Sequence, residues 1–251
     1  MLTLKRAGEG MKEYRFLKNG DKAITMELGN AIDEKINRRV TAVCNAILQQ
    51  NRDGIVDIIP TFRSVTVCYE PEKIQIWKVK WLLKRAYRKC GKAQEEHKRI
   101  VCIPVCYGGE YGPDLSDVAA FHGLSEQAVI ETHCGRDYLI YMLGFLPGFP
   151  YLGGMDERLV TPRLDSPRVR IEPGSVGIGG QQTGIYPMAS PGGWRLIGRT
   201  PIPLYDPQRE DSVPYEAGDY IRFVPITPEQ YEQIAAQIKE GTYHLSIEES
   251  R

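Results

Sequence analysis

The chain has 251 residues, of which 42% are hydrophobic and 25% charged, with a formal net charge of zero. These values are typical of a soluble globular protein with one large or two small domains. The first 16 residues lack the apolar segment of a secretory signal, and no apolar run reaches the roughly 18 residues that a membrane helix needs. We therefore expect a cytoplasmic protein without membrane contacts.

Charge is distributed unevenly along the chain. Residues 1–99 hold 21 Lys and Arg against 12 Asp and Glu, whereas residues 100–251 hold 11 against 20. This asymmetry indicates two parts and would permit electrostatic docking on a partner. We expect an N-terminal tail over residues 1–11, a first domain over 12–98 and a second over 99–251.

The first part predicts alternating strand pairs and helices. Strands are expected at residues 13–17, 23–28, 54–60 and 64–70, with a further strand at 99–107. A helix is expected over residues 31–50 from the spacing of Ile32, Ile36, Val40, Val43, Ala46 and Ile47. A second helix, over residues 72–90, is expected to place on one face Ile74, Trp77, Trp81 and Leu82. This order predicts a small α+β domain of the ferredoxin-like kind.

The second part begins with two short helices and continues as short strands separated by Gly and Pro. The helices are expected to start near Asp114 or Ser116 and at Ser125. Strands are expected within 138–145, 169–178, 183–188, 193–200 and 218–226. This pattern is typical of a β-barrel or sandwich. A final helix at 228–240 has Pro at its first position and Gly just after its end.

A run of basic residues and the cysteines are both best explained by structural roles. Residues 78–99 hold nine Lys and Arg, which we interpret as a solvated helix face and not as a nucleic-acid site. Cys102 and Cys106 lie on one face of a strand, but no closely spaced pair such as C-x2-C occurs, and the four histidines are scattered. We therefore expect buried, reduced thiols and no metal. His133, near a strand, is a candidate general acid or base, although a structural role is the simpler interpretation.

The stretch "GSVGIGGQQTGIYPMASPGGW", residues 174–194, is rich in glycine. It is not a phosphate-binding P-loop, because no lysine occurs between Lys98 and Lys239. It is not a flexible linker, because apolar residues interrupt the glycines. Ordered backbone remains, either as tight barrel turns or as a surface that a ligand approaches closely.

Arginines favour the ligand alternative. Every basic residue from 100 to 238 is arginine, and five lie near the glycine-rich stretch: Arg163, Arg168, Arg170, Arg195 and Arg199. The planar guanidinium suits carboxylate or phosphate. These arginines could also pair structurally with Asp165, Glu172 or Asp206.

Several motifs resemble one family. They are "PGFPYLGG" at 147–154, "PRLDSPR" at 162–168, "PGSVGIGGQQTGIYPMASPGGWRLIGRTP" at 173–201 and "YDP" at 205–207. Upstream, "IPVCYGGEYGPDL", "IIPTFRSVTVCYEP" and "NGDKAITMELG" continue the resemblance over nearly the whole chain after residue 12. The chain is similar to the 5-oxoprolinase B-subunit family, also labelled allophanate hydrolase first subunit, which includes the Kip-type inhibitor of a sporulation histidine kinase. Glu172 and Tyr205 are conservative departures from the pattern.

The resemblance implies an α+β protein with a ferredoxin-like N-terminal domain followed by a cyclophilin-like β-barrel domain. It implies a role with subunits A and C in cleaving 5-oxoproline to glutamate at the expense of ATP. The ATP, with Mg²⁺ as its expected counter-ion, would bind either to this chain or to a partner subunit. ATP coupling suggests phosphorylation of the amide oxygen, with arginines stabilising the developing charge. The alternative function is inhibition of a sensor histidine kinase through the barrel, and a less favoured one is urea or allophanate processing.

The resemblance brings no catalytic assignment, so the candidate site follows from the motifs and the arginines. The expected catalytic residues are His133, Arg168 and Arg199. The expected substrate-binding residues are Arg163, Gly180, Gln182, Thr183, Tyr186, Ser190 and Trp194. An apolar partner groove is expected around Phe145, Phe149, Tyr151 and Trp194. We expect Arg168→Ala or Arg199→Ala to lower activity of the reconstituted complex without unfolding this subunit.

Overall fold

The structure is a computed structural model that describes residues 14–90, 98–209 and 212–250. The chain divides into two compact units, Met1–Gln94 and Glu95–Arg251. The expected N-terminal tail lies outside the described residues, as do residues 91–97 just before the expected start of the second domain at residue 99.

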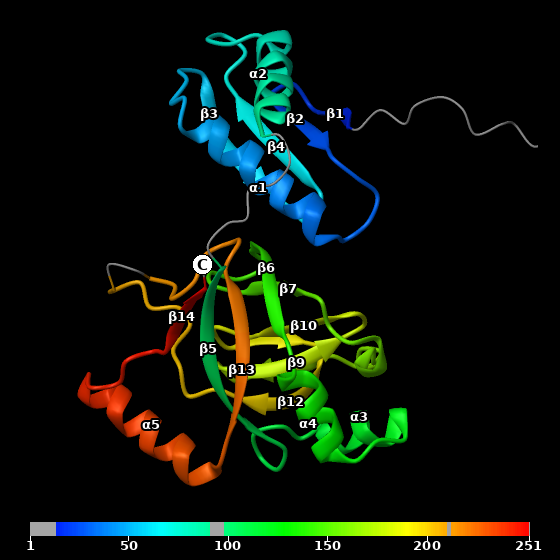
Figure 1. Cartoon of the computed structure of the whole chain (residues 1–251), viewed down its shortest axis with the longest axis vertical. Coiled ribbons are helices and arrows are strands. Elements are labelled where there is room, and N and C mark those ends of the chain that lie inside the picture. Colours follow the sequence, from blue (N-terminus) through cyan, green and yellow to red (C-terminus); the bar gives the residue numbers. More distant parts are fainter. Residues whose placement is uncertain (1–13, 91–97, 210–211, 251) are drawn as a thin grey trace, which may run out of the picture. The chain divides into compact units, whose positions relative to one another are not determined.

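The first unit is a four-stranded antiparallel sheet with two helices (Figure 1). Its strand order is β1-β2-β4-β3, so β4 lies between the two strands that α1 connects. Its elements are β1 Arg15–Asn19, β2 Ala23–Glu27, α1 Glu34–Leu48, β3 Ile55–Pro60, β4 Ser64–Tyr69 and α2 Ile76–Lys89. The predicted order of strands and helices is confirmed, whereas the ferredoxin-like designation stays a prediction.

Local chemistry explains where α1 begins. The Asp33 side chain accepts a hydrogen bond from the Ile36 backbone N–H at 3.1 Å, which caps the helix. Ile32 therefore precedes the helix and is exposed. The expectation that α1 includes residues 31–33 was wrong because the N-cap at Asp33 was overlooked.

The inward face of α2 differs from the predicted one. Trp77 and Trp81 are 59% and 50% exposed. The buried side chains follow an i, i+3, i+4, i+7, i+8 stripe: Val79, Leu82, Leu83, Ala86 and Tyr87. The buried stripe continues to the last turn of the helix, whereas the predicted one ends at Leu82, and six Lys and Arg cover the rest of the helix. The two tryptophans therefore share the solvent face, where Lys78 lies over the Trp77 ring and Arg85 over the Trp81 ring.

The second unit is built on an eight-stranded, nearly closed sheet (Figure 1). The strand order is β10-β9-β12-β5-β13-β6-β7, with β14 also paired to β5, and the end strands β10 and β7 contact each other. The strands are β5 Lys98–Tyr107, β6 Asp137–Leu143, β7 Pro150–Gly153, β9 Ser175–Gly179, β10 Gln182–Ile185, β12 Arg195–Arg199, β13 Tyr220–Ile226 and β14 Ile247–Ser250. The expected strand at 99–107 thus belongs to this unit. The predicted β-barrel arrangement of strands is confirmed, and the cyclophilin-like designation stays a prediction.

Smaller elements surround this sheet. β8 and β11 form a separate two-stranded sheet. The other elements are α3 Leu115–His122, α4 Glu126–Cys134, the short 3-10 helix η1 Glu157–Leu159, β8 Arg168–Ile171, β11 Ser190–Gly192 and α5 Pro228–Glu240. Strands β7 and β11 were not predicted, because runs of four and three residues carry too little periodicity.

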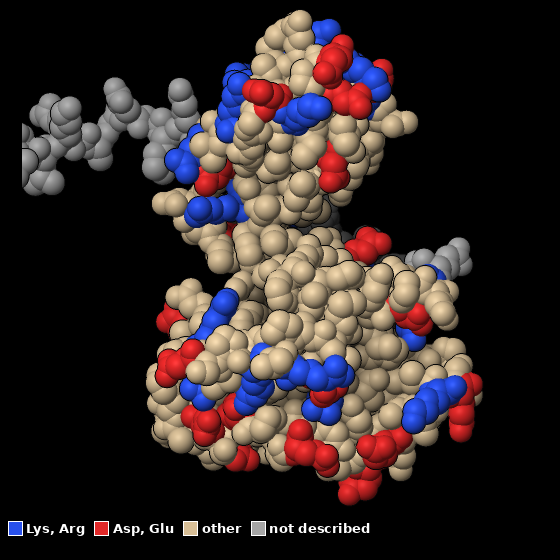
Figure 2. All heavy atoms as spheres, turned by 180° about the vertical axis from the view of Figure 1, so that it is seen from behind, with Lys and Arg blue, Asp and Glu red and all other residues tan. Residues whose placement is uncertain are grey.

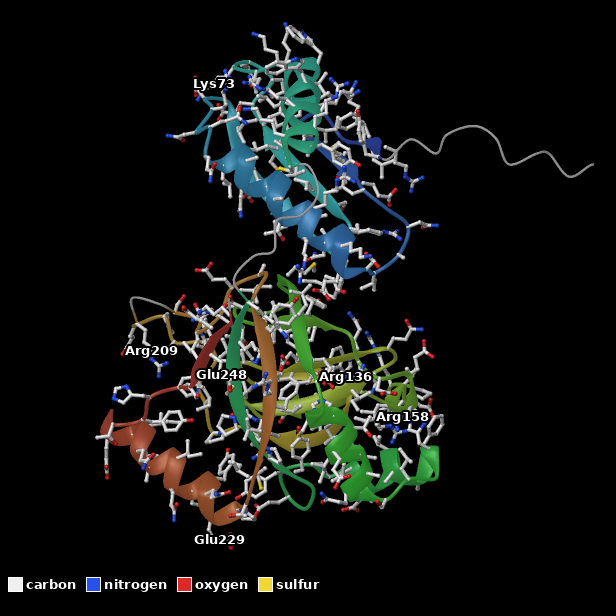
Figure 3. The ribbon with its side chains drawn as sticks, in the orientation of Figure 1. Lys73, Arg136, Arg158, Arg209, Glu229 and Glu248 are labelled. Atoms are coloured by element: carbon white, nitrogen blue, oxygen red, sulfur yellow. The ribbon has the colours of Figure 1, made fainter. Side chains whose placement is uncertain are left out.

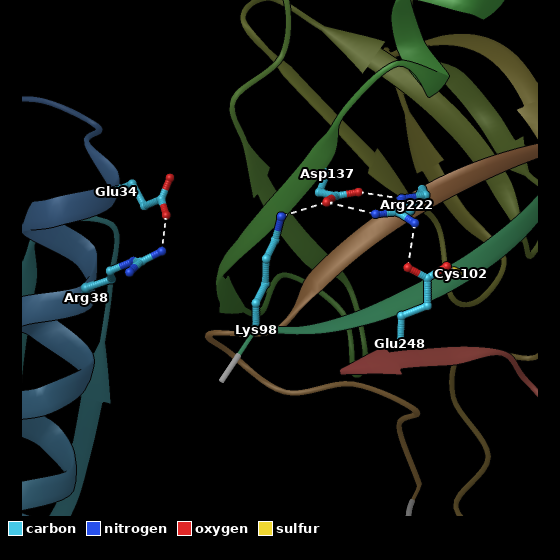
Figure 4. Close-up of polar contacts among 7 residues, drawn as sticks. All are labelled: Glu34, Arg38, Lys98, Cys102, Asp137, Arg222 and Glu248. Atoms are coloured by element: carbon cyan, nitrogen blue, oxygen red, sulfur yellow. Dashed lines mark hydrogen bonds and ion pairs between the residues drawn. The ribbon is translucent and has the colours of Figure 1, made fainter. Parts of the chain in front are cut away.

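Ion pairs join four strands at one place in the second unit (Figure 4). Asp137 at the start of β6 accepts from Lys98 of β5 at 2.6 Å and from Arg222 of β13 at 2.6 and 3.1 Å. Arg222 also donates to Glu248 of β14 at 2.7 Å. Because each charge has a partner, this network serves to fix the strands rather than to bind a ligand.

The surface charge of the second unit is patterned. In the view of Figure 2, acidic side chains lie along much of its outer rim, while Lys and Arg gather in a middle band below an uncharged area. This agrees with the acidic excess of residues 100–251 and with arginines as its main cations.

Candidate functional site

A small aromatic pocket lies in the second unit beside the glycine-rich stretch. It encloses about 170 Å³ and is lined by Phe145, Phe149, Tyr151, Arg163, Tyr186, Pro191, Gly192, Gly193 and Trp194. Drug-sized ligands occupy pockets of about 300–1,000 Å³, so this one suits a smaller molecule or a single side chain. The structure thus brings together three expected substrate-binding residues and all the expected partner-groove residues in one pocket.

Aromatic edge-to-face contacts build the wall. Phe149 lies at the centre, with ring centroids 5.5 Å from Tyr186 and 5.7 Å from Trp194 at interplanar angles near perpendicular. Tyr151 lies 5.3 Å from Phe149 on the other side. Such arrangements are favourable for aromatic pairs and fix the shape of the wall.

The glycines make room for these rings. A side chain at Gly179 would collide with the Trp194 indole, and one at Gly192 would approach the Tyr186 hydroxyl to 2.6 Å. At Gly184 it would press against both the Phe149 and Trp194 rings. Gly179, Gly184 and Gly192 therefore make room for the chain's own aromatic side chains, and the rings line the pocket together with Gly192 and Gly193.

Arg163 is the charged group of the pocket. Its guanidinium lies 5.9 Å from the Trp194 ring centroid. It is exposed, and within the described part of the chain no carboxylate pairs with it. An unpaired arginine on an aromatic wall offers a planar donor fork to a carboxylate.

The other arginines near the stretch have partners, with one exception. Arg168 donates to Asp114 at 2.7 Å, Arg170 to Glu172 at 2.7 Å and Arg195 to Asp117 at 3.2 Å. Arg199 is half-buried and makes no ion pair among the described residues, and its Nε is buried without a hydrogen-bond partner. It does not line the pocket.

Arg168 serves the fold. Asp114 is buried, and its other oxygen accepts from the Leu196 backbone N–H at 2.6 Å. The Arg168–Asp114 pair therefore ties β8 to the segment before α3 and to β12. Sequence reasoning treated Asp114 only as a helix cap and missed this role. Arg168→Ala removes the partner of a buried carboxylate, so we expect it to destabilise the subunit, while its predicted effect on activity stays a prediction.

His133 lies inside the barrel, away from the pocket. It is 0% exposed and stacks on Phe223. Thr183 donates to the Gly177 carbonyl at 3.1 Å, so its hydroxyl accepts from His133 Nε2–H at 2.8 Å. His133 Nδ1 then accepts from the Tyr107 hydroxyl at 2.8 Å.

This hydrogen-bond chain holds the histidine neutral. Burial lowers the pKa of His133 from 6.5 to about 3. A general acid or base must reach the reacting group, and neither ring nitrogen of His133 is free or near solvent. The structure therefore gives His133 and Thr183 structural positions and does not bring His133 together with Arg168 or Arg199.

The remaining expected residues also lie off the pocket. Gly180, with a φ of 64°, forms the β9–β10 turn, and its N–H donates to the Thr161 carbonyl at 2.8 Å. Gln182 begins β10 beside this turn. Ser190 is buried on β11, and its hydroxyl has no hydrogen-bond partner among the residues that the structure describes. The pocket residues that sequence reasoning missed are Pro191, Gly192 and Gly193, whose signal was the Gly-Gly pair directly before Trp194.

Other places in the described residues offer less. A larger, open depression in the first unit is lined by residues 51–56, Glu70 and Lys73. Lys73, labelled in Figure 3, pairs with Glu70 at 2.7 Å and with Asp53 at 3.6 Å. The six cysteines are free thiols, three of them buried. Over these residues no group of three His, Cys, Asp or Glu is placed to hold a metal ion.

Comparison with known proteins agrees with the sequence motifs. The family model described as "Carboxyltransferase domain, subdomain C and D" matches residues 14–215. The B subunit of 5-oxoprolinase from Bacillus subtilis is 43% identical over 228 residues, which cover 87% of this chain and 95% of that protein. The chain belongs to the 5-oxoprolinase B-subunit family.

Two further relatives extend this family likeness. The crystal structure of TTHA0988 superposes with a TM-score of 0.73 at 36% identity, over 82% of this chain and 40% of that one. The urea amidolyase of Saccharomyces cerevisiae is 24% identical over the whole chain but over only 15% of its own length. This member of the B-subunit family thus corresponds to one segment of these longer proteins.

No helix in residues 14–90, 98–209 or 212–250 combines the length and the apolar character required to cross a membrane. For this family member the pocket beside Trp194 is the candidate site, because it alone joins an unpaired cation to an aromatic cavity among the described pockets.

Proposed function

We propose that this chain is the B subunit of a cytoplasmic, ATP-dependent 5-oxoprolinase that converts 5-oxo-L-proline to L-glutamate together with subunits A and C. The observation that carries the proposal is the 43% identity along 95% of a protein named as the B subunit of 5-oxoprolinase. A second protein of that name, from Escherichia coli, is 41% identical over 97% of its length.

The pocket supports a part for this chain in holding the substrate. 5-Oxoproline is a small five-membered ring with one carboxylate, a size compatible with a cavity of about 170 Å³. Its ring carbons match the aromatic wall of Phe149 and Trp194. Its carboxylate matches the unpaired Arg163. The chain would bind and orient the ring while water is excluded from its apolar face.

The residues of this pocket do not fit ATP. A nucleoside triphosphate is larger than the cavity, and Arg163 is the one cation among the described lining residues. Phosphate cradles use several backbone N–H groups or a lysine, whereas here the backbone at Gly179 and Gly192 faces aromatic rings. We propose that ATP, with Mg²⁺, is bound by another subunit.

The test is reconstitution. The purified chain is mixed with candidate subunits A and C, ATP, Mg²⁺ and 5-oxoproline, and glutamate is measured, with each protein omitted in turn. Glutamate should form only when all three are present. Unchanged glutamate formation when this chain is omitted would contradict the proposal.

A second candidate function, binding and silencing a sensor histidine kinase, uses the same pocket. It is favoured by the exposure of Phe145, an apolar side chain that a protein partner would cover. A kinase autophosphorylation assay with and without this chain tests it. Urea or allophanate processing is less favoured, because the urea amidolyase likeness is distant.

A further inference from the structure

Phe145 has an unusual backbone. Its φ is 63°, and the other described non-glycine residue with positive φ is Asn51. Asparagine tolerates this region, whereas a bulky aromatic residue there is an outlier. Strained residues of this kind cluster at ligand-binding sites when the surrounding structure holds them in place.

Hydrogen bonds hold the strain in place. The Leu146 N–H donates to the Gly144 carbonyl at 2.7 Å, which closes a three-residue γ-turn centred on Phe145. The Gly144 N–H donates to the Phe149 carbonyl, and the Phe149 N–H donates to the Leu146 carbonyl, at 3.1 and 3.0 Å. The buried Tyr215 hydroxyl anchors the loop through the Gly148 carbonyl at 2.7 Å.

The strained backbone of Phe145 does not bury its side chain in the absence of a ligand. The Phe145 side chain is 64% exposed, and its ring meets Phe149 edge-on at 5.6 Å. Yet this conformation places the ring on the wall of the pocket that also holds Arg163 and Trp194. An exposed apolar ring held at the rim of a cavity has its contact surface available to whatever fills that cavity.

We propose that Phe145 is a specificity-determining residue of this pocket, whose ring covers the apolar face of a small cyclic carboxylate while Arg163 pairs with the carboxylate. The identity of the ligand, 5-oxoproline, rests on the proposed function. The γ-turn sets the position of the ring before binding, so little side-chain freedom is lost when the ligand arrives.

The experiment uses Trp194 as a reporter. The full chain has three tryptophans, and Trp77 and Trp81 are exposed, so Trp77→Phe with Trp81→Phe leaves the pocket tryptophan alone. In this background, 5-oxoproline should change the fluorescence saturably. Phe145→Ala and Phe145→Gly should each weaken binding about ten-fold, which corresponds to one aromatic contact.

Thermal unfolding separates a specificity role from a structural one. Phe145→Gly should unfold at a temperature equal to or above that of the parent and above that of Phe145→Ala, because glycine adopts positive φ at little cost. Phe121→Ala is the matched control, since Phe121 is 60% exposed but lies on α3, outside the pocket. It should leave 5-oxoproline affinity unchanged.

Two results would overturn the inference. One is parent-like affinity in Phe145→Gly while the parent responds to 5-oxoproline. The other is no Trp194 response in a chain that still supports glutamate formation with its partners, which would reject this pocket and leave the proposed function standing. Failure of glutamate formation together with a normal Phe145-dependent response would instead reject the proposed function alone.

Discussion

The interior of the barrel and the pocket beside Trp194 both combine polar groups with aromatic rings, but they differ in how those polar groups are satisfied. Inside the barrel, both nitrogens of His133 have partners, and those partners are bonded in turn. In the pocket, Arg163 makes no ion pair within the described chain, and Phe145 is exposed on strained backbone. Polar groups whose hydrogen bonds are all made within the chain stabilise the fold, whereas a charged group without an ion pair can bind a ligand.

The largest expected effect is on the barrel interior. His133→Ala should lower the free energy of unfolding by about 3–5 kcal/mol, because it leaves a cavity, removes the acceptor of the Tyr107 hydroxyl and removes one of the two hydrogen bonds of the Thr183 hydroxyl. Denaturant titration measures this loss as a shift in the unfolding transition of the second unit. A His133→Ala chain that is as stable as the parent but inactive would contradict the structural role and indicate that His133 is catalytic.

Arg168→Ala should have the next largest effect on the free energy of unfolding. Asp114 would keep its bond from Leu196 N–H but lose its cation, and because Arg168 is partly exposed we expect a loss of about 2 kcal/mol. The double variant with Asp114→Asn should be less destabilised than the sum of the single variants. Additive effects would show that the pair contributes nothing.

The pH dependence of stability isolates His133. Between pH 6.5 and about 3 the unfolded chain binds a proton at this residue and the folded chain does not. Its contribution to stability is therefore complete above pH 6.5 and is lost as the pH falls, at up to about 1.4 kcal/mol per pH unit. His133→Gln, compared with the parent at pH 7, 6 and 5, should show a shallower decline. Parallel curves would mean that His133 protonates normally in the folded chain.

The smallest effect on stability is expected in the pocket. Arg163→Gln should change the free energy of unfolding by no more than about 0.5 kcal/mol, since the side chain is exposed. It should weaken 5-oxoproline binding by about ten-fold to a hundred-fold, as for a lost charged hydrogen bond. Arg170→Gln is the control, because that exposed arginine pairs with Glu172 and lies outside the pocket. An equal loss of 5-oxoproline affinity in both variants would contradict a specific role for Arg163 in binding.

Regular elements were predictable wherever one periodicity dominated. α5 begins and ends where Pro228 and Gly241 indicated, and β4 alternates buried and intermediate residues as a half-buried strand should. The inward face of α2 was predicted through Trp77 and Trp81, but the face packed against the sheet runs through Val79 and Leu83 and leaves both tryptophans exposed. The strands β7 and β11 were missed for lack of length, yet both adjoin the pocket.

The sequence by itself determined the family, the barrel texture of the second part and the residue types of the site, because long motifs and turn residues are local signals. It named Arg163 and Tyr186 for substrate binding and the Phe145–Tyr151 group for a partner groove, with Trp194 as the one residue common to both. Only the tertiary structure joined them into one pocket and assigned the glycines to the rings they accommodate. It also separated His133 and Arg168 from that pocket, because a partner such as Thr183 or Asp114 lies about 50 residues away in sequence and meets them only in the folded chain.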